Sequence, residues 1–139
     1  MRIKKVRIIV NPASGRREPI LQVINTSMRE AGILWEASIT HKAGDATRFA
    51  KAAVKEGVDA LAVYGGDGTL MEAIGGIIGS ALPMAILPGG SANVMATELG
   101  IPTALTEACT LLSRMPLHIR IIPGAVKVVV SPKKDDAIE

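Results

Sequence analysis

Short apolar runs alternate with segments of helical periodicity along the first 113 residues. The runs that are typical of buried strands lie at residues 6–10, 34–40, 60–64 and 84–87. Helices are predicted between and after them, at residues 19–31, 45–56, 70–78, 92–99 and 103–112. A regular strand–helix alternation implies right-handed crossovers between parallel strands. The sequence therefore predicts a three-layer α/β/α fold around a mainly parallel sheet.

Single residues mark the ends of several predicted helices. Gly32 and Gly57 follow two of them, at the position where a left-handed backbone conformation ends a helix. Asp45 stands at the start of another helix and is predicted to cap it.

The end of the chain has a different pattern. Two short strands are predicted at residues 118–122 and 126–130, joined as a β-hairpin by Pro123-Gly124-Ala125. An isolated hairpin is marginal in water, so it must pack on the sheet, on a second copy of the chain or on a further domain. We therefore divide the chain into an α/β domain at residues 1–113 and a hairpin with a polar tail at residues 114–139. Exposed hairpin edges predict a homodimer.

Composition narrows the class of protein. Apolar residues make up 48% of the 139 residues and charged residues 21%, which excludes a disordered chain. We expect no transmembrane helix and no secretory signal, because the apolar run after the basic first residues stops at Asn11-Pro12. One cysteine, Cys109, excludes an internal disulfide and a Cys-rich zinc site. Without a membrane span, a secretory signal or a disulfide, we expect a cytoplasmic domain that is either free or peripheral at the inner membrane face. Three aromatic residues are too few for a base-stacking platform, so we expect no nucleic-acid partner.

Charge is distributed unevenly along the chain. Residues 1–55 carry 11 basic and four acidic side chains, whereas residues 56–126 carry two basic and six acidic ones. The basic half can face an anionic ligand or the anionic inner face of a membrane. The simpler interpretation is an ordinary solvated basic surface.

Three glycine-rich turns carry the candidate chemistry, and each follows the carboxyl end of a predicted strand. In parallel sheets, ligands bind at this edge. In the segment Gly65-Gly66-Asp67-Gly68-Thr69, glycines let backbone N–H groups approach a phosphate, and the next helix points its positive end at the same place. Asp67 can bind Mg²⁺ or accept a hydrogen bond from a sugar or base. The alternative is a tight strand-to-helix turn with Asp67 as the N-cap.

The other two turns are weaker signals by themselves. One contains Ser91 and Asn93 after Pro88-Gly89-Gly90, and the other runs from Asn11 through Ser14 and Gly15 to two arginines. Each is also consistent with a simple capped turn. The chain has neither a GxxxxGK[ST] P-loop nor a GxGxxG dinucleotide fingerprint, which excludes a standard Walker nucleotidase and a Rossmann dehydrogenase.

Together and in this order, the motifs NPASG, GGDGT and LPGGSAN resemble the diacylglycerol kinase catalytic domain family, which includes bacterial lipid kinases and the related sphingosine and ceramide kinases. The resemblance covers residues 3–113. GGDGT is shared with NAD kinases and resembles phosphofructokinase loops, so NPASG makes the distinction. The resemblance implies the α/β/α fold of the NAD kinase and diacylglycerol kinase N-terminal domains, with ATP and Mg²⁺ as cofactors.

By this similarity the nucleotide-binding residues are Asn11, Thr40, Gly65, Gly66, Asp67, Gly68, Thr69, Leu70, Met71 and Ser91, with Asp67 serving Mg²⁺ through the nucleotide. The supporting residues are Ser14, Gly15, Glu72, Gly89, Gly90 and Asn93. The chain departs from the family pattern at Met71, where the family usually has Asn, at Val94, where it often has Asp, and at Ser91, where Thr is common.

Family members are about twice as long and carry a second, β-sandwich domain that supplies the general base and completes the lipid site. Residues 114–139 would then begin that domain. The resemblance implies phosphoryl transfer from ATP to a lipid hydroxyl in the complete enzyme, with peripheral membrane contact, and little or no turnover by this chain alone. Two other hypotheses stay open: an NAD-kinase-like domain, and a non-catalytic module that dimerises or docks on a partner through the hairpin.

Overall fold

The computed structural model describes residues 2–13, 17–90, 93–114, 117–122 and 126–132. The strands are β1 (Lys5–Val10), β2 (Leu34–Ile39), β3 (Ala60–Gly65), β4 (Met84–Pro88), β5 (Ile119–Ile122) and β6 (Val126–Val129). The helices are α1 (Ile20–Ala31), α2 (Asp45–Glu56), α3 (Asp67–Ile77), α4 (Val94–Glu98), α5 (Leu105–Thr110) and the 3-10 turn η1 (Leu111–Ser113).

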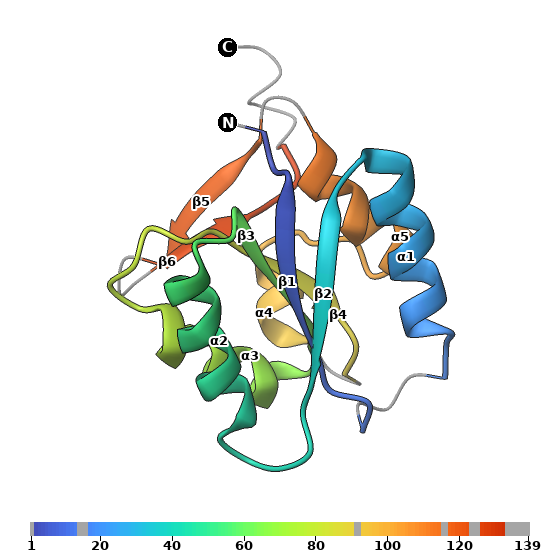
Figure 1. The fold of residues 1–139 in the computed structure, drawn as a ribbon. Coiled ribbons are helices and arrows are strands. Elements are labelled where there is room, and N and C mark those ends of the chain that lie inside the picture. The colour runs from blue at the N-terminus through green and yellow to red at the C-terminus, as the bar shows by residue number, and fades with distance from the viewer. Residues whose placement is uncertain (1, 14–16, 91–92, 115–116, 123–125, 133–139) are drawn as a thin grey trace.

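The strands form a single sheet in the order β2-β1-β3-β4-β6-β5, and every neighbouring pair is parallel except β5 with β6. Helices α2 and α3 cover one face of the sheet, and α1 and α5 cover the other (Figure 1). The central strand β3 is buried along its whole length, as expected for an apolar strand with helices on both faces. The predicted three-layer fold with a mainly parallel sheet is confirmed.

All the predicted helices are present; α2 has the predicted bounds, and the other helices differ from prediction by one to three residues at one or both ends. Helix α3 begins at Asp67, three residues earlier than predicted, because the glycine-rich segment itself forms its first turn. The last predicted helix ends at Thr110 and tightens into η1, and the helix predicted at 92–99 is described only over Val94–Glu98. Gly32 and Gly57 end their helices in the left-handed conformation with φ of 70° and 73°, as predicted.

The hairpin packs on the α/β domain itself. Strand β6 pairs with β4, where Met84 lies opposite Val128, and β5 adds the edge of the sheet. The predicted boundary at residue 113 therefore separates two segments of one continuous sheet, and whether the hairpin also begins a second domain stays a prediction. The connecting residues 123–125 lie outside the described part of the chain. Ile119 and Ile121 on β5 are exposed, and the predicted homodimer stays a prediction.

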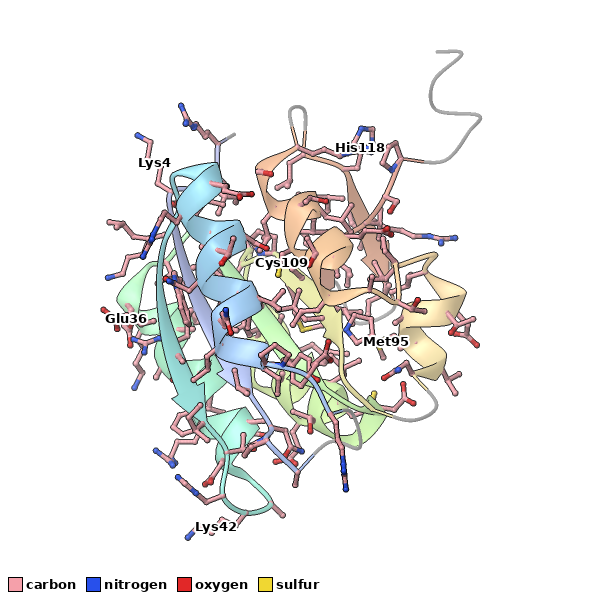
Figure 2. All side chains as sticks on the ribbon, turned by 90° about the vertical axis from the view of Figure 1, so that its right-hand side faces the viewer. Lys4, Glu36, Lys42, Met95, Cys109 and His118 are labelled. Atoms are coloured by element: carbon pink, nitrogen blue, oxygen red, sulfur yellow. The ribbon has the colours of Figure 1, made fainter. Side chains whose placement is uncertain are left out.

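The register brings the carboxyl ends of four strands to one edge. Val10 at the end of β1 pairs with both Ile39 of β2 and Tyr64 of β3, and Gly65 pairs with Pro88 of β4. The loops that follow these strands therefore share one end of the molecule. Figure 2 shows Lys42, in the loop after β2, at this end and His118 at the opposite end.

The single cysteine of the chain lies on the face of the sheet opposite α2 and α3. Cys109 on α5 is buried, and burial raises the pKa of its thiol to about 11, although a hydrogen bond with the side chain of Ser27 opposes that effect (Figure 2). The thiol is therefore protonated at neutral pH and behaves as a small apolar side chain. Among the described residues, no helix is both long and apolar enough to cross a membrane.

Two adjacent glycines in α3 predict opposite effects on stability. A Cβ added at Gly76 would lie 2.6 Å from both the Ala50 Cβ and the Thr47 carbonyl oxygen of α2, whereas one added at Gly75 would meet nothing within 4 Å. We expect Gly76→Ala to destabilise the fold by about 1–3 kcal/mol through overpacking. Gly75→Ala should stabilise it by about 0.4–1 kcal/mol, because alanine loses less backbone entropy in a helix. Urea unfolding of the two variants measures both values, and equal signs would contradict this packing of α2 on α3.

Candidate functional site

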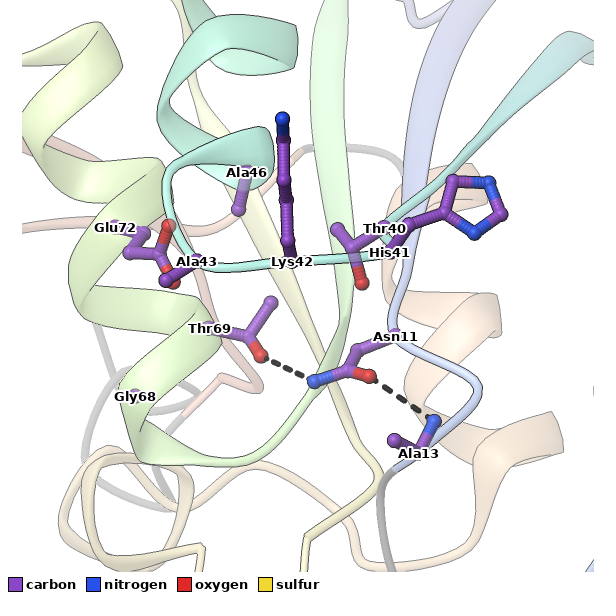
Figure 3. Close-up of a pocket in the computed structure, with 10 residues that line it drawn as sticks. All are labelled: Asn11, Ala13, Thr40, His41, Lys42, Ala43, Ala46, Gly68, Thr69 and Glu72. Carbon is purple, nitrogen blue, oxygen red and sulfur yellow. Dashed lines mark hydrogen bonds between the residues drawn. The ribbon is translucent and has the colours of Figure 1, made fainter.

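A cavity of about 410 Å³ opens at the edge where β1, β2 and β3 end. Its walls come from the loop after β1, the loop that leads from β2 into α2, and the first turns of α3 (Figure 3). The lining residues are Asn11, Ala13, Thr40, His41, Lys42, Ala43, Ala46, Gly68, Thr69 and Glu72. The side chains of Thr40, Thr69 and Asn11 point toward one another inside it (Figure 3).

Asn11 joins the first loop to α3. Its Nδ2 donates to Thr69 Oγ1 at 2.9 Å, and its Oδ1 accepts the Ala13 N–H at 3.0 Å (Figure 3). Its own backbone N–H donates to the Tyr64 carbonyl at 2.9 Å, at the end of β3. The Asn11 side chain thus fixes the geometry of the cavity floor, and the Thr69 hydroxyl keeps its proton available for another acceptor.

Two carboxylates shape the loop from Thr40 to Gly44. Asp45 Oδ2 accepts the His41 and Lys42 N–H groups at 2.8 and 3.1 Å, and Glu72 Oε1 of α3 accepts the Gly44 N–H at 2.5 Å. The prediction that Asp45 caps α2 is therefore wrong: Gly44 occupies the N-cap position, and the Asp45 carboxylate turns back to the preceding loop. Together Asp45 and Glu72 hold one wall of the cavity from both sides.

The two glycine-rich loops are packed against each other. A Cβ added at Gly90 would lie only 2.6 Å from the Gly66 Cα, and the Gly89 N–H donates to the Gly65 carbonyl at 3.1 Å. Asn93 holds the second loop closed, because its Oδ1 accepts the Gly90 N–H at 2.9 Å and its Nδ2 donates to the Gly90 carbonyl at 2.6 Å. Gly66 and Gly90 therefore serve backbone-to-backbone packing, whereas a Cβ added at Gly89 would meet the ring of Tyr64 at 2.6 Å.

Gly68 differs from the other glycines of the GGDGT segment. It lines the cavity, and nothing lies within 4 Å of the place where a Cβ would stand. A Cβ at Gly65, in contrast, would meet Thr69 at 2.8 Å. The two roles weighed for this segment, a tight turn and a close approach to a ligand, are thus divided between residues: Gly65 and Gly66 form the turn, and Gly68 leaves open space.

Asp67 links α3 to α4. Its Oδ2 accepts the Val94 N–H at 3.0 Å and its Oδ1 accepts the Met95 N–H at 3.1 Å. These bonds, first from Met95 and then from Val94, lower the pKa of the Asp67 carboxyl. Asp67 therefore stays ionised and satisfies the first N–H groups of a helix 27 residues away. The alternative in which Asp67 caps its own helix is wrong.

The predicted site residues have different positions and roles in the structure. Those that line the cavity are Asn11, Thr40, Gly68, Thr69 and Glu72. Those that pack the two loops together or link them to α4 are Gly65, Gly66, Asp67, Gly89, Gly90 and Asn93. Leu70 is buried in the core, and Met71 is exposed on α3. Ser14, Gly15 and Ser91 lie outside the described residues.

Three lining residues next to Thr40 were not predicted to belong to the site. These are His41, Lys42 and Ala43, in the loop after β2. Their position could have been predicted, because this loop follows the carboxyl end of a strand, as the three glycine-rich turns do. The loop has no glycine cluster, so composition does not draw attention to it. Lys42 lines the cavity and is exposed, and its ammonium end points away from Asn11 and Thr69 (Figure 3).

The predicted site residues could hold a magnesium ion only together with a bound ligand that supplies further coordinating oxygens. Among the described residues no group of three or more His, Cys, Asp or Glu side chains is arranged to hold a metal. Magnesium commonly binds through one or two carboxylates together with substrate phosphates and water. Asp67 is consistent with that arrangement, because each of its oxygens accepts one N–H and keeps a further lone pair.

The ionised Asp45 carboxylate should make the loop sensitive to acid. Its pKa is lowered, chiefly by the hydrogen bond from the His41 N–H and further by Lys42 and Arg48, despite its burial. A depressed folded-state pKa contributes stability above the unfolded value of about 3.9, and this stability is lost as the pH falls through the folded pKa. We expect Asp45→Asn to be less stable than wild type at neutral pH and to lose less stability on acidification below about pH 4. Chemical unfolding across that pH range measures the difference, and parallel curves for the two proteins would contradict it.

The sequence of this chain matches a known family over most of its length. The sequence model of the diacylglycerol kinase catalytic domain family matches residues 5–122, which include all four loops at the cavity edge. The chain belongs to this family. The NPASG, GGDGT and LPGGSAN motifs therefore did identify the family, and the match also extends over the strand β5.

The relatives of this family member are lipid kinases by name. A diacylglycerol kinase of Staphylococcus carnosus is 38% identical over 109 residues, which are 76% of this chain and 36% of the relative. The "Probable lipid kinase YegS" of Salmonella newport is 37% identical over 108 residues, which are 75% of this chain and 36% of the relative. The crystal structure of a diacylglycerol kinase from Bacillus anthracis has a TM-score of 0.76 at 30% identity and covers 88% of this chain and 45% of that one. The chain thus spans about a third of the length of these curated relatives.

Proposed function

We propose that this chain is the nucleotide-binding part of an ATP-dependent lipid kinase, and that ATP occupies the cavity at the carboxyl edge of the sheet. The observation that carries the proposal is the open space at Gly68, at the amino end of α3 and inside the cavity. A helix amino end favours anions because its N–H groups and its dipole face them. The phosphates would lie there.

Other groups of the cavity suit a nucleotide phosphate chain. The hydroxyls of Thr40 and Thr69 can donate to phosphate or ribose oxygens, and the Lys42 ammonium can lie near the phosphates. Magnesium, bound with ATP, would neutralise the charge that develops on the transferred phosphoryl group. Asp67 and Asn11 act mainly by fixing the loops that present these groups, as their hydrogen bonds indicate.

We infer that this chain alone does not turn over a lipid. Phosphoryl transfer to a hydroxyl needs a base within hydrogen-bond reach of that hydroxyl. Among the lining residues Glu72 is the carboxylate, and its Oε1 is occupied by the Gly44 N–H. By the names of the relatives, the acceptor would be a diacylglycerol or another lipid. A complete enzyme would supply the base from residues outside this chain.

Thermal unfolding with and without Mg-ATP tests the proposal, with NAD as the second ligand. A ligand at about a hundred times its Kd stabilises the folded state by about 2.7 kcal/mol, which raises the Tm of a domain of this size by several degrees. We expect that shift with Mg-ATP and a smaller one with NAD. A larger shift with NAD would favour the NAD-kinase-like hypothesis, and no shift with either would favour the non-catalytic module. Phosphorylation of a lipid by the purified chain would contradict the inference on turnover.

A further inference from the structure

The outer surface of α2 carries a row of cations. Arg48, Lys51 and Lys55 are spaced i, i+3 and i+7, so they lie on one face of the helix. That face is opposite the buried residues Ala46 and Ala50. All three cations are exposed, and they border a shallow hollow of about 510 Å³ along the helix.

Little negative charge offsets this row. Glu56, next to Lys55, is exposed, but it pairs with Arg7 of β1 at 2.5 Å. Asp45, at the start of the helix, is buried, and its oxygens also accept the N–H groups of the loop before α2. It pairs with Arg48 at 3.3 Å, and that guanidinium stacks 4.5 Å above the ring of Phe49. In the part of the chain that the structure describes, Lys51 and Lys55 have no ion-pair partner.

The adjacent helix α3 exposes apolar groups. Met71 and Gly75 lie on α3 and Ile78 directly follows its last residue, at spacings of i, i+4 and i+7, and Met71 and Ile78 are 58% and 54% exposed. None of the three carries a charge. Since α2 and α3 pack closely through Gly76, the cations and the exposed apolar groups lie on neighbouring helices, and we call the exposed residues of both the α2–α3 face.

A cationic row beside exposed apolar side chains is the chemistry of surfaces that lie on anionic bilayers, where basic groups meet headgroups and apolar groups enter the interface. A surface for single-stranded nucleic acid would expose aromatic rings for stacking. The one ring at this face, Phe49, is half-buried beneath Arg48. A purely electrostatic partner, such as an acidic protein segment, would not need the exposed Ile78.

We propose that the α2–α3 face docks this domain on an anionic lipid bilayer, with Arg48, Lys51 and Lys55 against the headgroups and Ile78 in the interface. The cavity lies at the amino ends of the same two helices, where Ala46 and Gly68 line it. Docking by this face would therefore hold the cavity at the membrane surface. The proposal does not depend on nucleotide binding, so its test is carried out without nucleotide.

The test is co-sedimentation of the purified chain with phosphatidylcholine vesicles, with and without phosphatidylserine. We expect binding only to the vesicles that contain phosphatidylserine, weakened by added salt. The variant Lys51→Gln/Lys55→Gln should bind about 25-fold more weakly, since each cation near an anionic surface strengthens binding by about fivefold. Ile78→Ser should also weaken binding. The matched control Lys4→Gln/Arg29→Gln, which removes the same charge from the residue before β1 and from α1, should bind like wild type.

Three results would overturn the proposal. The first is no binding of the wild-type chain to phosphatidylserine vesicles. The second is equal weakening by the Lys4→Gln/Arg29→Gln control, which would mean that net charge alone causes the binding. The third is binding that Ile78→Ser leaves unchanged and that heparin or polyglutamate matches, which would indicate a soluble polyanion as the partner. Melting curves of all variants confirm that each is folded before its binding is compared.

Discussion

Gly90→Ala is expected to lower the Tm of this domain by roughly 4–12 °C, the equivalent of about 1–3 kcal/mol of overpacking in a domain of this size. The reason is the close contact of the two glycine-rich loops. The added Cβ would lie 2.6 Å from the Gly66 Cα and 3.3 Å from its backbone nitrogen. Backbone atoms cannot move aside like the end of a flexible side chain, and the hydrogen bond between Gly89 and Gly65 holds the loops together.

The matched control for this prediction is Gly68→Ala in the same motif. A Cβ at Gly68 meets nothing within 4 Å, so we expect the Tm to stay within a degree or two of wild type. The same Cβ would project into the cavity, so Gly68→Ala should weaken Mg-ATP binding without destabilising the fold. If Gly90→Ala melts like wild type, the contact between the loops does not explain why these positions are glycine.

Asp67→Asn is expected to reduce both the stability of the domain and its response to Mg-ATP. Asparagine keeps one acceptor oxygen but turns an NH₂ group toward either the Val94 or the Met95 N–H, so one of the two hydrogen bonds to α4 is lost. It also removes the negative charge proposed to serve the magnesium ion. We expect Mg-ATP affinity to fall by about tenfold or more, the size of effect seen when a group that supports a metal site is removed.

Isothermal titration with Mg-ATP and thermal unfolding of the free protein measure the two effects of Asp67→Asn separately. Glu98→Gln is the matched control, because it removes an exposed carboxylate from α4, at the other end of the helix from the Asp67 contact. This control should behave like wild type in both measurements. An Asp67→Asn protein with wild-type Tm and wild-type affinity would contradict both the link to α4 and the role in magnesium binding.

The strands and the edge at which they end could be predicted from sequence because they depend on local patterns. The apolar run of β3 and the glycines after α1 and α2 specify their structures within a few neighbouring residues. The family could be identified for a similar reason, since NPASG, GGDGT and LPGGSAN are contiguous motifs.

The roles of single residues inside the site could not be predicted, because they depend on contacts between distant segments. Gly65, Gly66 and Gly68 are chemically identical in the sequence, and the structure separates them by what lies within 4 Å of each. Asp67 bonds to α4 across 27 residues, and Asp45 turns back from its helix to the preceding loop. The sequence also left three possible surfaces for the packing of the hairpin, and the pairing of β6 with β4 decides between them.

The central claim, that nucleotide binds at the carboxyl edge of the sheet, is tested most directly by backbone amide chemical shifts during a titration with Mg-ATP. The account predicts that the largest changes fall on residues 40–43 and on Gly68, Thr69 and Glu72, which line the cavity, with smaller changes at Val94 and Met95 through their bonds to Asp67. Amides of β5 and of the α1–α5 surface should be unaffected. If the largest chemical-shift changes fell on that surface or on the hairpin, and the shifts of the cavity residues did not change, the claim would be contradicted.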